Sequence, residues 1–364
     1  MLRISDDMVN RQHYIYDEIR TDGRPVVIYG AGEVGRLVTA LLRAHGIEPF
    51  AFAVDRVYYR EGTEVEHIRV CPYEEFLAAA DDYLFLLGIG GPANRVRAFL
   101  NDVRGRRMAV TTPYGEYAPM DAGFLRANEE RLQETYAWLA DDLSKETMQA
   151  YVDLKLSGDL RSIFDVFEED QYFNNISVSA RGGAFVDCGA FTGDSAEAFV
   201  RWSGGTCKRV IALEPDAHNY ALLQENMKRY PFPVTTYPVG AWSGCDVLRF
   251  QTKESQGTGT HVSDEGEFAI HVDALDHLID DQVDFIKMDI EGAEMRALAG
   301  AQKLICRYHP MLAIAVYHKS EDLVTIPQYI KTFDTPDVIY RLYLRKHHIG
   351  DELELDLYAV PEKR

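Results

Sequence analysis

The sequence predicts an α/β protein with two domains, each built around a mostly parallel sheet. Short apolar segments alternate with stretches of helical spacing in both halves of the chain, and a charged helical region separates the halves. The 364 residues are also enough for two domains of roughly 100 to 200 residues each. We therefore expect a smaller Rossmann-like domain at residues 1–118, a helical connector at 119–175 and a larger domain at 176–364.

The composition narrows the class of function. With 38 Lys and Arg against 58 Asp and Glu, the formal net charge is −20, which disfavours nucleic acid and anionic membrane surfaces as partners. A small-molecule or glycan substrate fits this charge better, and a homo-oligomer stays open. The five cysteines are scattered without a C-x-x-C pair, and no segment has the roughly 18 apolar residues of a membrane span. We expect a cytoplasmic protein without membrane insertion.

The first domain begins with a glycine-rich turn. Apolar segments at 25–30, 49–55, 83–90 and 108–115 are its expected strands. Gly30, Gly32 and Gly35 form a G-x-G-x-x-G pattern after the first strand, and Asp55 ends the second, as in dinucleotide-binding domains. The domain is short for a dinucleotide, so a mononucleotide, a nucleotide-sugar or no ligand are the alternatives. It resembles the small Rossmann-like domain that precedes sugar-modifying transferases of surface-glycan pathways.

The larger domain has seven expected strands. The charged region before it, from about residue 121 to 171, has apolar residues at helical spacing and forms the connector. Too few residues separate the last two strands for a crossover helix, so these two must pair as an antiparallel hairpin. The expected strands are 184–189, 208–216, 233–240, 284–290, 311–318, 339–345 and 353–360.

The turn after the first of these strands has the pattern of a nucleoside site. Asp187 ends the strand, Gly189 and Gly193 frame the turn, and Asp194 or Ser195 is the expected cap of the following helix. Glu214 ends the next strand, where a carboxylate can accept hydrogen bonds from both ribose hydroxyls. An acid at the first strand tip opposes a pyrophosphate and suits the ammonium group of a methionine moiety. The alternative is that the glycines only shape a turn. The other candidate cofactor-binding residues are Ala190, Phe191, Thr192, Asp194, Pro215, Asp216, Trp242 and Asp289.

Four segments together carry a resemblance to a known family. They are VDCGAFTGD (186–194), ALEPD (212–216), DFIKMDIEGAEMRALAGA (284–301) and LAIAVYHKSEDLVTIPQYI (312–330). They resemble the FkbM-type family of S-adenosylmethionine-dependent methyltransferases, over about residues 170 to 364. The resemblance implies a class I methyltransferase fold, with a seven-stranded sheet that is parallel except for one strand of the C-terminal hairpin. It also implies methyl transfer from S-adenosyl-L-methionine, commonly to a hydroxyl of a sugar, as in polysaccharide biosynthesis, or of another secondary metabolite.

Methyl transfer to a hydroxyl needs a group that accepts its proton or a metal that acidifies it. His318 and Asp289 end two strands at the expected ligand edge and are the catalytic candidates; His318 is favoured because imidazole titrates near neutral pH. A structural role for His318 at a strand end is the alternative. Candidate substrate-binding residues are Glu291, Glu294, His261 and Lys319, with His261 in a loop at 252–267 that can act as a lid.

Two further alternatives concern the metal and the class of protein. Asp289, Glu291, Glu294 and His318 can form a divalent-metal site of oxygen and imidazole ligands, although metal independence is the default expectation. The chain can instead be an NAD-dependent oxidoreductase or a non-catalytic nucleotide-binding scaffold that uses the N-terminal GAGEVG turn. The absence of a Tyr-x-x-x-Lys pair after the first domain disfavours the oxidoreductase, and the nearly complete C-terminal motifs disfavour the scaffold.

Overall fold

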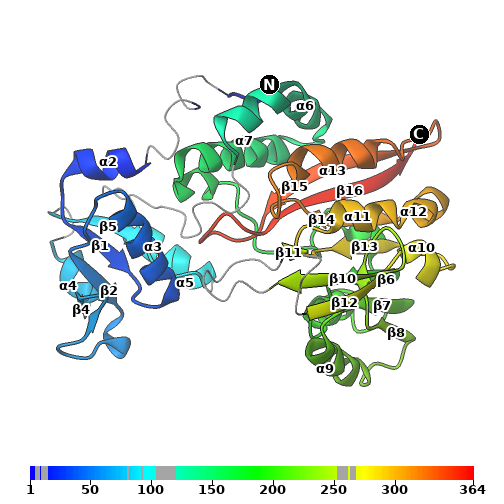
Figure 1. Ribbon diagram of the computed structural model, residues 1–364, viewed down its shortest axis with the longest axis horizontal. Helices are drawn as coiled ribbons and strands as arrows, with labels where there is room; N and C mark the ends of the chain where they lie inside the picture. Colours follow the sequence, from blue (N-terminus) through cyan, green and yellow to red (C-terminus); the bar gives the residue numbers. More distant parts are fainter. Residues whose placement is uncertain are drawn as a thin grey trace. The chain divides into compact units, whose positions relative to one another are not determined.

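The computed structural model describes most of the chain (Figure 1), and the chain divides into two compact units. The described residues are 1–4, 9, 15–79, 82–91, 93–103, 120–251, 261–262 and 268–364. The first unit contains Met1–Ala137, Asp142–Glu169 and Arg345–Leu355, and the second contains Trp138–Asp141, Asp170–Leu344 and Asp356–Arg364. The boundaries at residues 118 and 175 stay a prediction.

The first unit contains a sheet of strand order β3-β4-β2-β1-β5. Its central strands β1 (Val26–Tyr29), β2 (Ala51–Val54) and β5 (Leu84–Leu87) are parallel and almost wholly buried, which confirms three of the four strands expected here. The fourth, at 108–115, lies outside the described residues. The pattern did not predict β3 (Glu64–Val65) or β4 (Ile68–Pro72). The first has only two residues, neither of them buried, and the second alternates between buried and more exposed positions.

Helices complete the first unit. In the expected connector region the structure has α6 (Ala122–Trp138) and α7 (Asp142–Ser157), as the helical spacing predicted. The tip of the C-terminal hairpin, residues 345–355, groups with these helices. There Glu352 Oε2 lies 2.5 Å from Lys155 Nζ, and both side chains are buried. The remaining elements are α2 (Ile15–Asp22), α3 (Glu33–Ala44), the 3-10 helix η1 (Arg56–Tyr58), α4 (Tyr73–Leu77), α5 (Ala93–Asp102) and the 3-10 helix η3 (Leu160–Ile163).

The second unit contains the expected seven-stranded sheet, in the order β15-β16-β14-β13-β6-β7-β8. Five strands are parallel, β16 is antiparallel to β14, and β15 lies beside β16 as its hairpin partner (Figure 1). The strands are β6 (Ala184–Cys188), β7 (Arg209–Leu213), β8 (Val234–Tyr237), β13 (Phe285–Met288), β14 (Met311–Ala315), β15 (Val338–Lys346) and β16 (Leu355–Lys363). The helices are α8 (Asp194–Trp202), α9 (Ala217–Met227), α10 (Leu275–Leu278), α11 (Glu294–Ala299), α12 (Gln302–Tyr308) and α13 (Asp322–Lys331), with the 3-10 helix η4 (Val178–Ala180) before β6.

A separate small sheet is inserted between β8 and β13. Its order is β11-β10-β12-β9, and its strands are β9 (Gly240–Ala241), β10 (Asp246–Gln251), β11 (His261–Val262) and β12 (Phe268–Asp273). The expected lid at 252–267 lies outside the described residues, apart from the two residues of β11. The sequence indicated apolar strands on both sides of this segment but not that they form a sheet of their own.

Aromatic packing supports the centre of the large sheet. Phe185 of β6 stacks on Phe199 of α8 at a ring separation of 4.5 Å, and Phe285 of β13 lies 5.3 Å from Phe185. All three side chains are fully buried. Because β6 and β13 are adjacent, this cluster fixes the two strands whose carboxyl ends carry the candidate site.

Candidate active site

The glycine-rich turn joins β6 to α8. Helix α8 begins at Asp194, and its N-cap is Gly193 in the left-handed conformation (φ 94°), so the expectation that Asp194 or Ser195 caps the helix is wrong. The Ser195 hydroxyl instead donates to Asp187 Oδ2 at 2.5 Å. A left-handed cap suits glycine because no Cβ is present to clash with the backbone.

Asp187 lies beneath this turn and is fully buried. Its Oδ1 is 3.3 Å from Lys287 Nζ, which also donates to the carbonyl oxygen of Gly189 at 2.9 Å. Burial raises the pKa of the Asp187 carboxyl, and the Lys287 ammonium opposes that rise. The ion pair therefore ties β13 to the turn after β6. The contact between Asp187 and a methionine ammonium group stays a prediction.

Gly189 lets two loops approach each other. It has φ 77°, and a Cβ at this position would lie 2.2 Å from the carbonyl oxygen of Asp289. Any side chain here would force the β6 and β13 loops apart. Phe191, two residues later, also has a positive φ (47°), and its side chain is 53% exposed. The turn thus presents an exposed aromatic ring beside a tightly packed backbone.

Glu214 follows β7 and is held rigidly by backbone groups. Its Oε2 accepts from the Phe191 N–H and its Oε1 from the Asp216 N–H, both at 2.9 Å. Burial raises the pKa of this carboxyl, and the two N–H donors oppose the rise. Each carboxylate oxygen can accept two hydrogen bonds, so one acceptor position on each oxygen remains for a ligand hydroxyl. Asp216 itself caps α9 by accepting from the N–H groups of His218 and Asn219.

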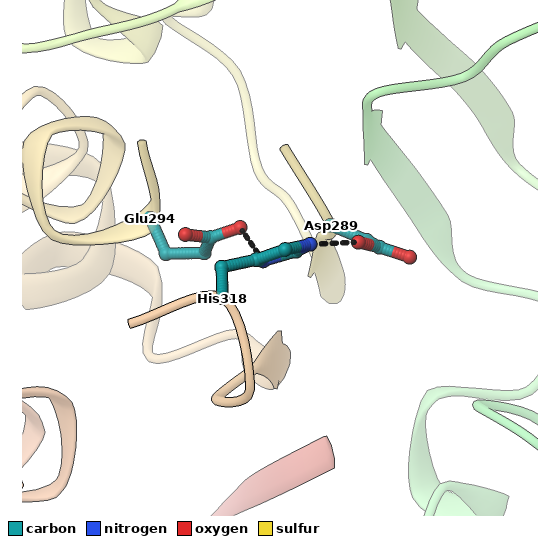
Figure 2. Close-up of side chains that lie close together, drawn as sticks. All are labelled: Asp289, Glu294 and His318. Atoms are coloured by element: carbon teal, nitrogen blue, oxygen red, sulfur yellow. Dashed lines mark ion pairs between the residues drawn. The ribbon is translucent and has the colours of Figure 1, made fainter. Parts of the chain in front are cut away.

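His318 lies between carboxylates after β14 (Figure 2). Its Nδ1 is 2.9 Å from Glu294 Oε1, and its Nε2 is 3.5 Å from Asp289 Oδ1 and 3.6 Å from Glu291 Oε2. Burial by itself lowers the pKa of His318. The hydrogen bond and charge of Glu294, with the charges of Asp289 and Glu291, outweigh burial and raise that pKa to about 9. The imidazole is therefore mostly protonated at neutral pH.

Asp289 is the more accessible member of this pair. Its side chain is 22% exposed, against 2% for His318. Two phenol hydroxyls hold the carboxylate: Tyr172 donates to Oδ2 at 3.0 Å and Tyr317 to Oδ1 at 3.3 Å. The structure thus brings Asp289, Glu291, Glu294 and His318 together, as the sequence predicted.

A divalent metal can be considered at the same place. Asp289, Glu294 and His318 each offer one ligand atom, and these atoms lie within 4.8 Å of one another. Oxygen and imidazole ligands suit several divalent metals. However, the proton on the imidazole ring at neutral pH competes directly with a metal for His318.

Several residues of the site were not singled out from the sequence. Lys287 belongs to the D-x-x-K-x-D pattern, which could have identified it as a site residue. Tyr172 and Tyr317 belong to no recognisable motif. Asp322, at the start of α13, is buried and accepts from the Lys319 N–H at 3.0 Å. Burial and the charge of Glu294 raise the pKa of Asp322 to about 7.

Three further residues predicted from the sequence are Lys319, Trp242 and His261. The Lys319 ammonium donates to the carbonyl oxygen of Gly292, in the loop before α11. Trp242 follows β9, and its backbone N–H donates to the carbonyl oxygen of Asp273 at 2.8 Å. The centre of its indole ring lies 5.7 Å from the Arg296 guanidinium. His261 begins β11, but its side chain lies outside the described residues. Roles for these three in ligand binding stay predictions.

Comparison with known proteins identifies the second unit. Residues 187–342 match the sequence model of the Methyltransferase FkbM domain, and this range includes the glycine turn, Glu214 and the His318 cluster. This part of the chain is an FkbM methyltransferase domain. The matched range begins at Asp187, within β6, and extends into β15.

Solved structures extend the comparison beyond the FkbM domain. Methyltransferase FkbM from Methylobacillus flagellatus KT is 25% identical and aligns over 97% of this chain and 95% of its own, with a TM-score of 0.70. A putative rRNA-methylase from Clostridium thermocellum aligns over 50% of this chain and 87% of its own, at 13% identity and a TM-score of 0.34. A TM-score this low supports no inference about the substrate of this chain. The search of curated proteins found no significant match.

The FkbM domain supports the methyltransferase among the classes of function considered from the sequence. The protein is an S-adenosylmethionine-dependent methyltransferase. Among the described helices, none has the length and apolar character to cross a bilayer.

Proposed function

We propose that the protein is an O-methyltransferase that acts on a hydroxyl of a sugar, a nucleotide-sugar or a related glycan or secondary metabolite. The single observation that carries this proposal is the partly exposed Asp289 carboxylate, held by two tyrosine hydroxyls beside the glycine turn. A fixed carboxylate suits an acceptor that must lose a proton. The net charge of −20 disfavours a polyanionic acceptor such as nucleic acid.

The residues of the second unit fit S-adenosylmethionine. Glu214 is fixed by two backbone N–H groups and keeps one acceptor position on each oxygen, which suits the two ribose hydroxyls of a nucleoside. The exposed ring of Phe191 and the glycine turn at 189–193 complete this side of the site. S-adenosylmethionine supplies an activated methyl group, so the chain's main tasks are to orient the acceptor hydroxyl and to receive its proton.

We assign the proton-accepting role to Asp289 rather than to His318, which the sequence had favoured. A protonated imidazole has no lone pair to accept a proton, and the pKa of about 9 keeps His318 protonated at neutral pH. Its side chain is also almost inaccessible, whereas Asp289 is within reach of solvent. The acceptor proton passes to an Asp289 oxygen as the hydroxyl oxygen forms its bond to the methyl carbon. The bond between the methyl carbon and the sulfonium sulfur breaks in the same step, and S-adenosylhomocysteine leaves. His318 acts as a positioning residue, because its ring lies between Glu294 on one side and Asp289 and Glu291 on the other.

The free cysteines support a small acceptor in the cytoplasm. All five cysteines are free, which suits a reducing compartment. A nucleotide-linked sugar or a free sugar is therefore a better acceptor candidate than an exported polymer, and self-association of the chain is compatible with this role.

The test is a methyl-transfer assay with purified full-length protein. S-adenosylhomocysteine release is measured with S-adenosylmethionine and a panel of nucleotide-sugars, free sugars, small phenols, peptides and RNA. We expect turnover with at least one sugar hydroxyl, and at least 100-fold lower kcat for Asp289→Asn. The exposed Glu225→Gln is the matched control, since Glu225 pairs only with Lys228 on the surface of α9 among the described contacts. Turnover confined to RNA or peptide would overturn the proposed acceptor class.

A further inference from the structure

The first unit contains a cavity whose lining residues are all different from those of the candidate active site. Its volume is about 460 Å³, within the range of small-molecule sites. The carboxyl ends of β1 and β2 and the loops after β1 and β5 line it, including Gly30, Gly32, Val54 and Gly88. All of these residues belong to the first unit.

The cavity lies where the strand order of the sheet reverses. From β1 the chain continues to β2 on one side, and β5 returns to pair on the other side of β1. In open α/β sheets ligands bind at the carboxyl ends of the strands at this reversal. The cavity therefore occupies the expected position of a ligand in this sheet.

The three glycines of the turn have different reasons to be glycine. A Cβ at Gly30 would lie 2.4 Å from the carbonyl oxygen of Gly88, and one at Gly35 would lie 2.2 Å from that of Gly30, so backbone packing requires both. Gly32 has no such reason: its φ is −84°, and a Cβ there would meet no atom within 4 Å. A side chain at Gly32 would project into open space at the cavity wall. Without it, the backbone at the start of α3 stays accessible from the cavity.

A hydrogen-bonded triad stands at one wall of the cavity. The Tyr29 hydroxyl donates to Asp55 Oδ1 at 2.6 Å, and an Arg95 guanidinium nitrogen lies 2.6 Å from Asp55 Oδ2. Tyr29 and Arg95 line the cavity, but Asp55 does not. Asp55 therefore positions these two groups, and its own contact with a ligand stays a prediction.

The rest of the lining indicates a planar, partly apolar ligand. Val34, Val54, Val65 and Val70 provide an aliphatic surface, and Tyr58, 62% exposed, places an aromatic ring at the wall beside Arg95. An aromatic ring next to aliphatic side chains suits a nucleobase. The Arg95 guanidinium provides charge-assisted donors for a phosphate. Glu33 is exposed at the same wall and opposes a phosphate by its charge.

We propose that this cavity binds a nucleotide with a single nucleoside, its base against Tyr58 and the valines and its phosphate near Gly32 and Arg95. The proposal is independent of the acceptor proposed for methyl transfer. It predicts that Gly32 serves the ligand, whereas Gly30 and Gly35 serve the fold.

The test is calorimetric titration of the full-length protein with ADP, UDP, NAD⁺ and inorganic phosphate in separate experiments. Saturating S-adenosylhomocysteine is present throughout to occupy the site in the second unit. We expect ADP or UDP to bind with a micromolar Kd. Gly32→Val should weaken this binding at least tenfold, and Tyr58→Ala should weaken it about tenfold, while Glu33→Gln should strengthen it about threefold.

Matched controls separate binding from folding. Gly91→Val changes a neighbouring exposed glycine that has open space and does not line the cavity, and Val57→Ala changes the exposed neighbour of Tyr58. Both should leave nucleotide affinity and S-adenosylhomocysteine affinity unchanged. Three results would overturn the proposal: no nucleotide binding, nucleotide binding that Gly32→Val leaves intact in a folded variant, or NAD⁺ or phosphate bound more tightly than both ADP and UDP.

Discussion

The imidazole Nδ1 of His318 lies 2.9 Å from Glu294 Oε1, and both side chains are almost completely buried. Glu294 Oε1 also accepts from the Ile290 N–H at 2.9 Å. One carboxylate therefore joins the loop after β13, the start of α11 and the segment after β14. Because a buried charge needs a charged partner, loss of the Glu294 carboxylate would leave the protonated His318 ring without its nearest one.

Cofactor affinity depends on Glu214. Glu214→Ala removes the carboxylate at the end of β7, so we expect S-adenosylhomocysteine binding to weaken by about 1.5 to 3 kcal/mol. Calorimetric titration measures this change directly. Glu225→Ala on the adjacent helix α9 is the control, because Glu225 is exposed and pairs with Lys228. Unchanged affinity in a folded Glu214→Ala protein would contradict the assignment.

The pH dependence of turnover separates the two candidate bases. If Asp289 accepts the proton beside a protonated His318, kcat/KM should fall as His318 loses its proton near pH 9. If His318 were the base, kcat/KM would instead rise up to about pH 9. His318→Gln should lower kcat less than Asp289→Asn does, and the reverse order would exclude our assignment.

The raised pKa of His318 also predicts how stability changes with pH. The folded pKa of about 9 exceeds the ordinary value of 6.5. The folded state therefore binds this proton more tightly, and the stabilisation is complete below pH 6.5 and lost as pH rises through 9. We expect the free energy of unfolding to fall by about 3 kcal/mol over that interval. Urea titrations of wild type and His318→Gln measure it, and equal pH dependence in the two proteins would refute the prediction.

Asp322 predicts a change in a lower pH range. Its folded pKa of about 7 exceeds the ordinary value of 3.8, so its ionisation destabilises the fold as pH rises from about 4 to 7. Asp322→Asn keeps an oxygen for the Lys319 N–H and removes the charge. We expect this variant to be about 1 to 3 kcal/mol more stable than wild type at pH 8 and no more stable at pH 3.5. Thermal unfolding at the two pH values tests this, with the exposed Asp281→Asn as control.

Metal removal should leave turnover nearly unchanged. A divalent cation bound to His318 would have to displace the proton that the raised pKa of this ring favours at neutral pH. We expect kcat after dialysis against EDTA to remain within about twofold of the untreated protein. Loss of turnover that Mg²⁺ or Mn²⁺ restores would instead assign Asp289, Glu294 and His318 as metal ligands.

Much of the architecture follows from local sequence patterns. The apolar segments around Val186, Ile211 and Ile286 predicted buried parallel strands, and all three became central strands of the large sheet. The short spacing between β15 and β16 predicted their hairpin, because no crossover helix fits there. By contrast, β4 has only five residues with mixed burial, so its apolar pattern was too weak to predict a strand.

The sequence by itself determined the two α/β sheets, the glycine turn with Glu214, and the gathering of Asp289, Glu294 and His318 at one sheet edge. Strand ends of a parallel sheet meet at the same edge, so this gathering follows from chain order. Only the tertiary structure decided which groups pair and which face solvent. Lys287 meets Asp187, and His318 is buried among carboxylates while Asp289 stays accessible. These pairings join residues far apart in the chain, and protonation depends on burial and nearby charge, which no local pattern contains.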